Sequence, residues 1–326
     1  MKITALFAFV FLVMTGCSNN NATAGLLAEP PYRSLTDSIQ QEPDNAGLYY
    51  RRGALLYQNN QKTTAEQDLK KAWQLQPTEA HALSVVTVLI DQNRDSALAF
   101  IQQALQVLPK SVALHISLAR GYQQKGDVAQ ALSVTDQVLA QHPNSLDALL
   151  LKAELQKQQN NRSAALATLE KAYAYAPFDA ELAYNLAFEY AETRNAKVLA
   201  LTDSLIRMDA SGRHAEPYYI KGVYYENTGN TAQALLLYDQ AIQRDYNFLD
   251  AYMDKGRILY NQKKYDQALK TFQLPLTITP TYAEAYYWVA RCQQALNQKE
   301  EARLNYQRAY GLDQTLTEAK ESAEQL

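Results

Sequence analysis

The sequence predicts an all-α protein built as an α-solenoid of stacked helix pairs, and three observations support this fold class. Ala, Leu and Gln recur along the 326 residues while glycines number only 11 and prolines 10, a composition that favours helix over strand. Small residues stand at fixed offsets before several prolines. The prolines themselves recur at intervals of 34, 32, 34 and 34 residues, at Pro43, Pro77, Pro109, Pro143 and Pro177.

The small residues indicate where two helices approach each other closely. Alanine pairs precede three of the prolines, namely Ala65 and Ala72, Ala97 and Ala104, and Ala165 and Ala172. A second series of glycines and alanines lies earlier in seven of the repeats, where we expect the backbone of the paired helix to cross and larger side chains to overpack the contact. This series is Gly53, Ala119, Ala153, Ala187, Gly222, Gly256 and Ala290.

These residues resemble the signature of the tetratricopeptide repeat. In that signature, a bulky residue, a Leu-Gly or Leu-Ala pair and a Tyr on the first helix precede Ala, an aromatic residue or Leu, Ala and Pro on the second. The resemblance covers residues 45–314 and implies about eight antiparallel helix pairs, coiled into a right-handed superhelix. The fifth pair matches least, because its second helix lacks a clear small pair. The pairs are expected to begin near Ala46, Thr78, Val112, Leu146, Ala180, Ala215, Leu249 and Ala283.

Both ends of the array fit the same plan. Residues 33–44 resemble a lone second helix, an N-terminal half-repeat before the first complete pair. Residues 315–326 are mostly polar and are expected to form a capping helix that shields the last pair from water.

The first 16 residues have the anatomy of a secretory signal peptide. Lys2 precedes an apolar run from Ile3 to Met14, which is shorter than the roughly 20 residues that a membrane-spanning helix needs. The ending Met14-Thr15-Gly16-Cys17 resembles the bacterial lipobox, in which the cysteine is acylated on its thiol before cleavage. The resemblance implies a palmitate-type lipid anchor at Cys17.

The residues after this cysteine suggest how the protein is held and where. Residues 17–32 are polar, contain glycine and proline, and are expected to form a flexible tether. Ser18, in place of Asp, implies by family analogy the outer membrane of a Gram-negative cell. We therefore expect a lipid-anchored protein of the cell envelope that faces the periplasm.

Several classes of function are not expected. The 31 basic and 34 acidic residues give a net charge of −3 without a long run of either sign, so no nucleic-acid partner is expected. No catalytic motif such as Gly-x-Ser-x-Gly or His-Glu-x-x-His occurs, so no enzyme and no catalytic residues are predicted. The four histidines have no carboxylate or cysteine at ligand spacing, and neither a metal nor a cofactor is predicted. Cys292 is expected to be a buried, inert thiol.

The first helices of such an array line its inner face, which the resemblance implies is the docking surface. Tyr and Arg are common at interface hot spots, and both occur repeatedly at the inner positions. Core tyrosines of the signature, such as Tyr218, Tyr252, Tyr286, Tyr238 and Tyr306, need no partner. The inner positions include Tyr50, Tyr57, Arg120, Tyr184, Phe188, Tyr219, Arg257, Tyr260, Tyr287 and Arg291.

Five of these residues fall on one face of pairs six to eight and are the predicted partner-binding site: Tyr219, Arg257, Tyr260, Tyr287 and Arg291. Arg257 has Asp254 three residues earlier and can be paired already. Arg291 has Trp288 at the same offset, and a stacked guanidinium would present its donors to a partner's carboxylate. No pair has the Lys and Asn that the family's chaperone-tail clamp requires.

The sequence as a whole predicts a membrane-tethered scaffold that binds proteins or peptides of an envelope assembly. The alternative is a carrier lipoprotein that binds a small molecule or a glycan in the Tyr-rich groove. An enclosed pocket would favour the carrier, whereas a regular open array offers a groove.

Overall fold

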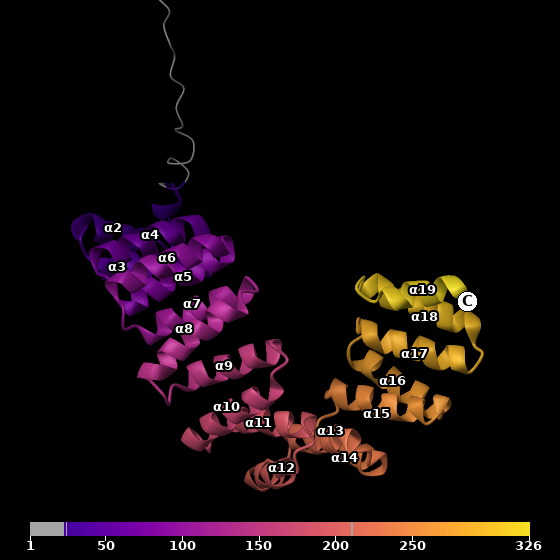
Figure 1. The fold of residues 1–326 in the computed structure, drawn as a ribbon. Helices are drawn as coiled ribbons and strands as arrows, with labels where there is room; N and C mark the ends of the chain where they lie inside the picture. The colour runs from indigo at the N-terminus through magenta and orange to yellow at the C-terminus, as the bar shows by residue number, and fades with distance from the viewer. Residues whose placement is uncertain (1–22, 24, 210) are drawn as a thin grey trace, which may run out of the picture. The chain divides into compact units, whose positions relative to one another are not determined.

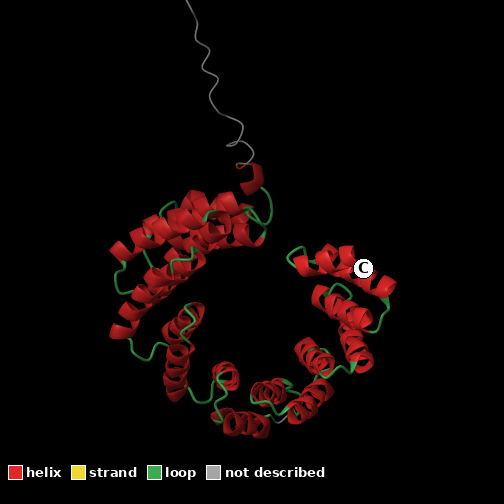
Figure 2. Cartoon of the chain, turned by 45° about the vertical axis from the view of Figure 1, so that its right-hand side comes forward, coloured by secondary structure: helices red, strands yellow, loops and turns green. Residues whose placement is uncertain are grey.

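The computed structural model describes residues 23, 25–209 and 211–326, and all regular elements in these ranges are helices joined by short loops (Figure 2). The predicted all-α solenoid class is confirmed. The chain divides into two compact units, with the boundary between Leu151 and Lys152 inside α9 (Leu146–Gln158). The predicted signal peptide and Cys17 lie outside the described residues.

The first unit contains the N-terminal helix and the first three pairs (Figure 1). Its helices are α2 (Arg33–Gln41), α3 (Ala46–Gln58), α4 (Lys62–Leu75), α5 (Glu79–Gln92), α6 (Arg94–Val107), α7 (Val112–Gln124) and α8 (Val128–Gln141).

The second unit contains the remaining pairs and a terminal helix. After α9 come α10 (Arg162–Tyr175), α11 (Ala180–Glu192), α12 (Lys197–Met208), α13 (Glu216–Asn227), α14 (Thr231–Arg244), α15 (Leu249–Asn261), α16 (Tyr265–Ile278), α17 (Ala283–Ala295), α18 (Lys299–Leu312) and α19 (Thr317–Gln325). The first helix of every pair begins within one residue of the position expected from the repeat.

The turns inside the pairs explain the one irregular proline interval. Most pairs turn through a residue with positive φ, either glycine, as at Gly126, or a residue such as Asn60. In the second pair a single residue, Asn93, both ends α5 and caps α6 by accepting a hydrogen bond from the Ser96 N–H. The turn between α3 and α4 has three residues, so the second repeat is two residues shorter.

The prolines mark the ends of the second helices. Pro43, Pro77, Pro109, Pro143 and Pro177 each lie two residues beyond the last residue of such a helix. Proline is common just past a helix end because it has no N–H and cannot continue the helix. Each proline therefore stops one pair shortly before the next begins.

The small residues of the first helices face large side chains of the second helices. A Cβ atom placed on Gly222 would lie 2.5 Å from Cε1 of Tyr238, and one on Gly256 would lie 2.5 Å from Cε1 of Phe272. Gly53 similarly faces Leu69, with 2.7 Å between the added Cβ and Cγ. We had expected the backbone of the paired helix at these points, and this was wrong. The glycines instead make room for a bulky side chain.

The start of the array is held by a buried polar network. Arg52 of α3 donates from Nε and Nη2 to the carboxylate of Asp68 in α4, at 2.6 and 2.8 Å. Its Nη1 donates to Oγ1 of Thr36 in α2, and that hydroxyl lies 2.8 Å from the carbonyl oxygen of Leu27. Tyr32 is buried as well. The last residues of the segment expected to be a flexible tether are therefore packed against the first pair.

The C-terminal end is covered by α19. Ala319 and Ala323 pack against Tyr306 and Ala309 of α18, while the other residues of α19 are exposed or half-buried. The small alanines let the helix lie close to α18, and its polar remainder faces solvent, as expected for a cap.

The fifth pair departs from the pattern in its second helix. Val198 and Leu205 of α12 are buried at the spacing that Ala234 and Ala241 have in α14. The larger side chains take the place of the alanine pair, which explains the weak signature. No described helix is long and apolar enough to cross a membrane.

Replacing Gly222 with alanine should destabilise the second unit. The added methyl group would meet the ring of Tyr238, which is fully buried and hydrogen-bonded to Glu226, so overpacking should cost about 1–3 kcal/mol. Gly311→Ala in α18 is the matched control, because no atom lies within 4 Å of the added Cβ. This control should gain up to about 1 kcal/mol from helix propensity. Urea unfolding measures both changes, and a stabilised Gly222→Ala protein would contradict the packing described above.

Breaking the Arg52–Asp68 pair should be costly, whereas replacing both residues should not. Asp68→Asn leaves a buried guanidinium without its counter-charge and should lower the free energy of unfolding by about 3–5 kcal/mol. The double replacement Arg52→Met with Asp68→Leu removes both charges and should lie close to the wild type. Thermal unfolding of the two variants tests this, and equal losses would contradict the view that the unpaired charge causes the destabilisation.

Candidate functional site

The predicted site lies on α13, α15 and α17, the first helices of pairs six, seven and eight in the second unit. The 34-residue repeat places Arg257 and Arg291 at the ninth position of successive pairs. The structure gathers the five predicted residues into two clusters. One cluster surrounds Asp254 and the other surrounds Arg291.

The first cluster is a charge network that connects three helices. Tyr219 of α13 donates its hydroxyl to Oδ2 of Asp254 in α15 at 2.8 Å. Arg257 donates from Nη2 to Oδ1 of Asp254, and its Nη1 lies 3.2 Å from Oε1 of Glu284 in α17. The prediction that Arg257 pairs with Asp254 is confirmed. Arg257 is therefore engaged by two carboxylates within the chain.

Burial raises the pKa values of two carboxylates in this cluster. Asp254 is only 6% exposed, and desolvation raises its pKa although Arg257 and Tyr219 oppose the shift. Desolvation likewise raises the pKa of Glu226, which accepts a hydrogen bond from Tyr238 at 2.6 Å. The same burial raises the pKa of the Tyr219 hydroxyl far above its usual value. Tyr219 thus acts as a hydrogen-bond donor within the fold.

The second cluster is an aromatic cage around Arg291. The guanidinium carbon lies 4.8 Å from the ring centroid of Trp288, 5.1 Å from that of Tyr260 and 5.7 Å from that of Tyr287. No carboxylate forms an ion pair with Arg291 in the ranges that the structure describes. The charge of Glu318 in α19 contributes to a raised pKa of Arg291 without forming an ion pair with it.

The repeat explains why the two arginines differ. Asp254 and Trp288 occupy the same position in pairs seven and eight, and Glu284 and Glu318 occupy equivalent positions near the starts of α17 and α19. An acid beside Arg257 is thus replaced by an indole beside Arg291. The first arginine is neutralised, while the second is a half-buried cation held by rings.

Tyr287 does not fit the role that was predicted for it. It is 8% exposed and packs in the core with Ala290 and Tyr306, and burial raises its pKa to about 12. Tyr286, predicted to be a core residue, is half-buried and packs against the same cluster. Tyr287 lies in one core cluster with Ala319 and Ala323 of α19, so the terminal helix covers it, and spacing along α17 alone does not specify this contact.

Sequence reasoning missed Glu284 and Glu226 as members of the first cluster. Glu284 comes from the next pair, 27 residues after Arg257, and only stacking of α15 and α17 brings them together. Tyr260 was predicted as a contact residue but not as a wall of the Arg291 cage. The signal in the sequence is an acid or an aromatic residue about one repeat away from each arginine, as Glu284 is from Arg257 and Tyr260 is from Arg291.

The other inner positions differ in their surroundings. Tyr184 stacks on His214 with 3.1 Å between its hydroxyl and Nδ1, and Phe188 is 38% exposed on the same helix. In the first unit, Tyr57 donates to Asp91 at 2.7 Å. A groove of about 360 Å³ lies between α3 and α5, where Tyr50 and Tyr57 form part of its wall.

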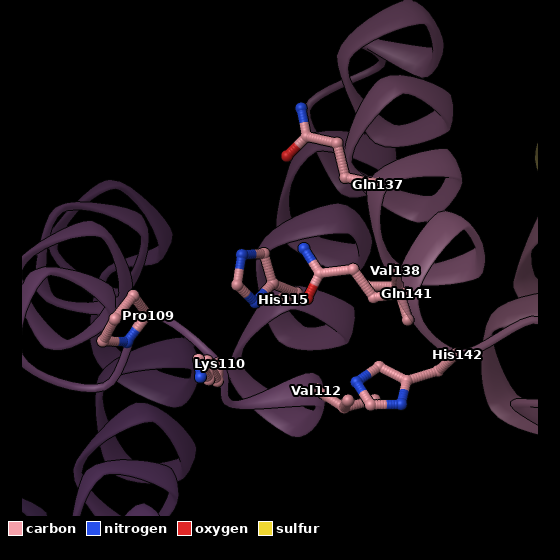
Figure 3. Close-up of a pocket in the computed structure, with 8 residues that line it drawn as sticks. All are labelled: Pro109, Lys110, Val112, His115, Gln137, Val138, Gln141 and His142. Atoms are coloured by element: carbon pink, nitrogen blue, oxygen red, sulfur yellow. The ribbon is translucent and has the colours of Figure 1, made fainter.

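The histidines and the cysteine show no catalytic arrangement. His115 and His142 line a pocket of about 30 Å³ beside Pro109 and Lys110 (Figure 3), too small for more than a water or two. No group of three potential metal ligands occurs among the described residues. Cys292 is fully buried, and burial raises the pKa of its thiol to about 12, so it is not a nucleophile at neutral pH.

Comparisons with solved structures show a shared fold. A crystal structure of a tetratricopeptide repeat protein from Parabacteroides merdae ATCC 43184 is 16% identical, with a TM-score of 0.60 over 75% of this chain and 97% of that chain. The human IFIT1 dimer with PPP-AAAA is 18% identical over 85% of this chain and 66% of that chain, with a TM-score of 0.46. MamA is 18% identical over 62% of this chain and 97% of that chain, with a TM-score of 0.33. The last two scores are too low to support an argument.

Comparison with protein families is decisive for the class of this protein. No curated protein matches the sequence. Models described as tetratricopeptide repeat match residues 46–79, 88–155, 122–187, 219–283 and 283–316. These matches cover well over half of the chain and lie within the array of helix pairs. The chain therefore belongs to the tetratricopeptide repeat family.

Proposed function

We propose that this protein is a lipid-anchored scaffold of a bacterial cell envelope that collects partner proteins on the first helices of pairs six to eight. Its family supports the coarser part of this proposal, because tetratricopeptide repeats are protein–protein interaction modules and generally scaffolds rather than enzymes. The partner-binding residues and the envelope location are our inference.

The observation that carries the proposed site is the unpaired cation at Arg291. A guanidinium has five N–H donors and remains charged at any physiological pH. Here the rings of Tyr260 and Trp288 hold it in one orientation, so little side-chain entropy is left to lose on binding. A preorganised, unpaired guanidinium favours a partner's carboxylate, which it can bind with two parallel hydrogen bonds.

The aromatic residues around Arg291 can add apolar contacts to a bound partner. Tyr260 and Trp288 are half-buried, so their remaining surface can contact an apolar side chain next to the carboxylate. The best fit is therefore an acidic partner segment with an apolar neighbour. The first cluster contributes differently, because its charges are satisfied within the chain and keep α13, α15 and α17 in register.

The anchor is supported by the leader sequence. The apolar run and the Gly16-Cys17 junction match the requirements for acylation, and each buried methylene of an acyl chain contributes about 0.8 kcal/mol to membrane binding. Two or more chains therefore hold a protein at a membrane stably.

Replacing Arg291 should strongly weaken partner capture with little effect on folding. Arg291→Gln removes the cation but no ion pair, so capture should weaken by about 2 kcal/mol, or roughly 30-fold, as for a hot-spot residue. Arg257→Gln is the matched control at the equivalent position, because it should destabilise the fold by leaving Asp254 buried without its counter-charge. The measurements are thermal unfolding and photo-crosslinking in intact cells from a reactive residue at Ala295.

A crosslinker at Gln307, on the exposed face of α18, serves as the control for the crosslinking position. Protein adducts from position 295 that disappear in Arg291→Gln support the site. Adducts that persist in this variant contradict it, and recovery of only a glycan or small ligand favours the carrier function instead.

Replacing Cys17 should release the protein from the membrane. Cys17→Ala removes the thiol that is acylated, so we expect unprocessed precursor and no incorporation of labelled palmitate. The measurements are metabolic labelling, gel mobility and membrane flotation. A processed Cys17→Ala protein that still floats with membranes would overturn the lipid anchor without affecting the proposed docking face.

A further inference from the structure

A small apolar pocket in the first unit lies outside the site described above. It has a volume of about 100 Å³ and is lined by α6, α7 and the end of α5. Ala97, Leu98 and Ile101 of α6 are buried and form the inner wall. Gly121 of α7 faces Leu98 so closely that an added Cβ would lie 2.4 Å from its Cδ2. Close packing of Leu98 and Gly121 therefore fixes this side of the pocket.

Two arginines line the same pocket without a counter-charge. Arg94 is the first residue of α6, and Arg120 lies on α7. Neither guanidinium forms an ion pair with any residue that the structure describes. The neighbouring acid, Asp95, is occupied by Lys125, with 2.7 Å between Oδ1 and Nζ. The start of a helix also favours negative charge, so the mouth of the pocket is left electropositive.

We propose that this pocket binds a carboxylate that carries a short apolar group. An apolar cavity of about 150 Å³ accommodates benzene, so a pocket of this size suits a branched aliphatic group of about four carbons. Arg94 and Arg120 would bind the carboxylate through charge-assisted hydrogen bonds, while Ile101 and Leu98 contact the apolar group. Both a free aliphatic acid and the C-terminal residue of a leucine-ending peptide have this chemistry.

The inference extends beyond the proposed docking face, because the pocket lies in a different unit and shares no residue with the Arg291 cage. Its failure would leave the proposal for Arg291 unchanged. Conversely, loss of partner capture in Arg291→Gln would say nothing about this pocket.

The probe is 4-methylpentanoate, measured by saturation-transfer NMR on the full-length protein in lipid nanodiscs with empty nanodiscs as the blank. We expect saturable binding in the millimolar range, since so small a ligand has few atoms to contribute. The neutral 4-methylpentanamide should bind at least about fivefold more weakly, because it loses the charge-assisted bonds. Acetate, which has no group to fill the pocket, should not bind measurably.

Three variants and a control locate the binding. Arg94→Gln and Arg120→Gln should each weaken it about fivefold or more. Ser117→Leu should block the pocket, and it leaves no buried group unpaired because the Ser117 hydroxyl bonds only its own helix at Ala113. Arg33→Gln, at an exposed arginine of α2, should have no effect. Thermal unfolding confirms that each variant is folded.

A second arm identifies the source of the ligand. N-acetyl-Ala-Ala-Leu with a free carboxylate competes with the probe if the pocket accepts a peptide terminus, whereas its C-terminal amide should not compete. Competition supports the proposal with a peptide ligand, and probe binding without competition supports it with a free acid. Equal binding of acid and amide probes, binding that survives Arg120→Gln and Ser117→Leu, or no binding of either ligand would overturn it.

Discussion

Five of the eight helix pairs have a steric match between a small residue on the first helix and a larger one 16 residues later on the second. Gly53 faces Leu69, Gly222 faces Tyr238 and Gly256 faces Phe272, in each case with too little space for even a methyl group. Tyr306 and Leu169 are buried at the same spacing from Ala290 and Ala153. Because a protein interior is close-packed, the bulk of one partner determines how small the other must be. The match fixes how each such pair closes, and the closed pair presents its first helix to the next.

The same repeat geometry gives two arginines different roles. Arg257 and Arg291 are equivalent by position, yet the residue three places earlier is Asp254 in one pair and Trp288 in the other. The first arginine is neutralised by two carboxylates and joins neighbouring pairs, and removing it would leave a buried acid. The second is held by aromatic rings with its charge unpaired. An array of similar units can thus use one position for stability in one repeat and leave it available for recognition in the next.

Polar groups at the two ends of the chain also serve different purposes. At the N-terminal end, the buried Arg52–Asp68 pair extends through Thr36 to the backbone of Leu27, so the segment around Leu27 is attached to the folded body. At the C-terminal end, α19 contributes only small alanines to the core and is otherwise polar. The N-terminal end is held by a buried ion pair, and the C-terminal end is covered by a mostly polar helix. Both arrangements satisfy the requirement that the outermost pairs of a stacked array have no exposed apolar face.

The sequence by itself determined the helical class, the number and starts of the pairs, and the positions of the small residues, because these follow from local periodicity and from prolines that end helices. It also indicated that Arg257 pairs with Asp254, since both lie on one helix three residues apart. Only the tertiary structure decided that Tyr287 is buried, because α19 covers it with Ala319 and Ala323. Only the stacking of successive pairs brings Glu284 to Arg257 and Tyr260 to Arg291, from helices about one repeat apart. Contacts between repeats depend on how the pairs close and stack, and that geometry arises from packing of side chains that no local pattern encodes.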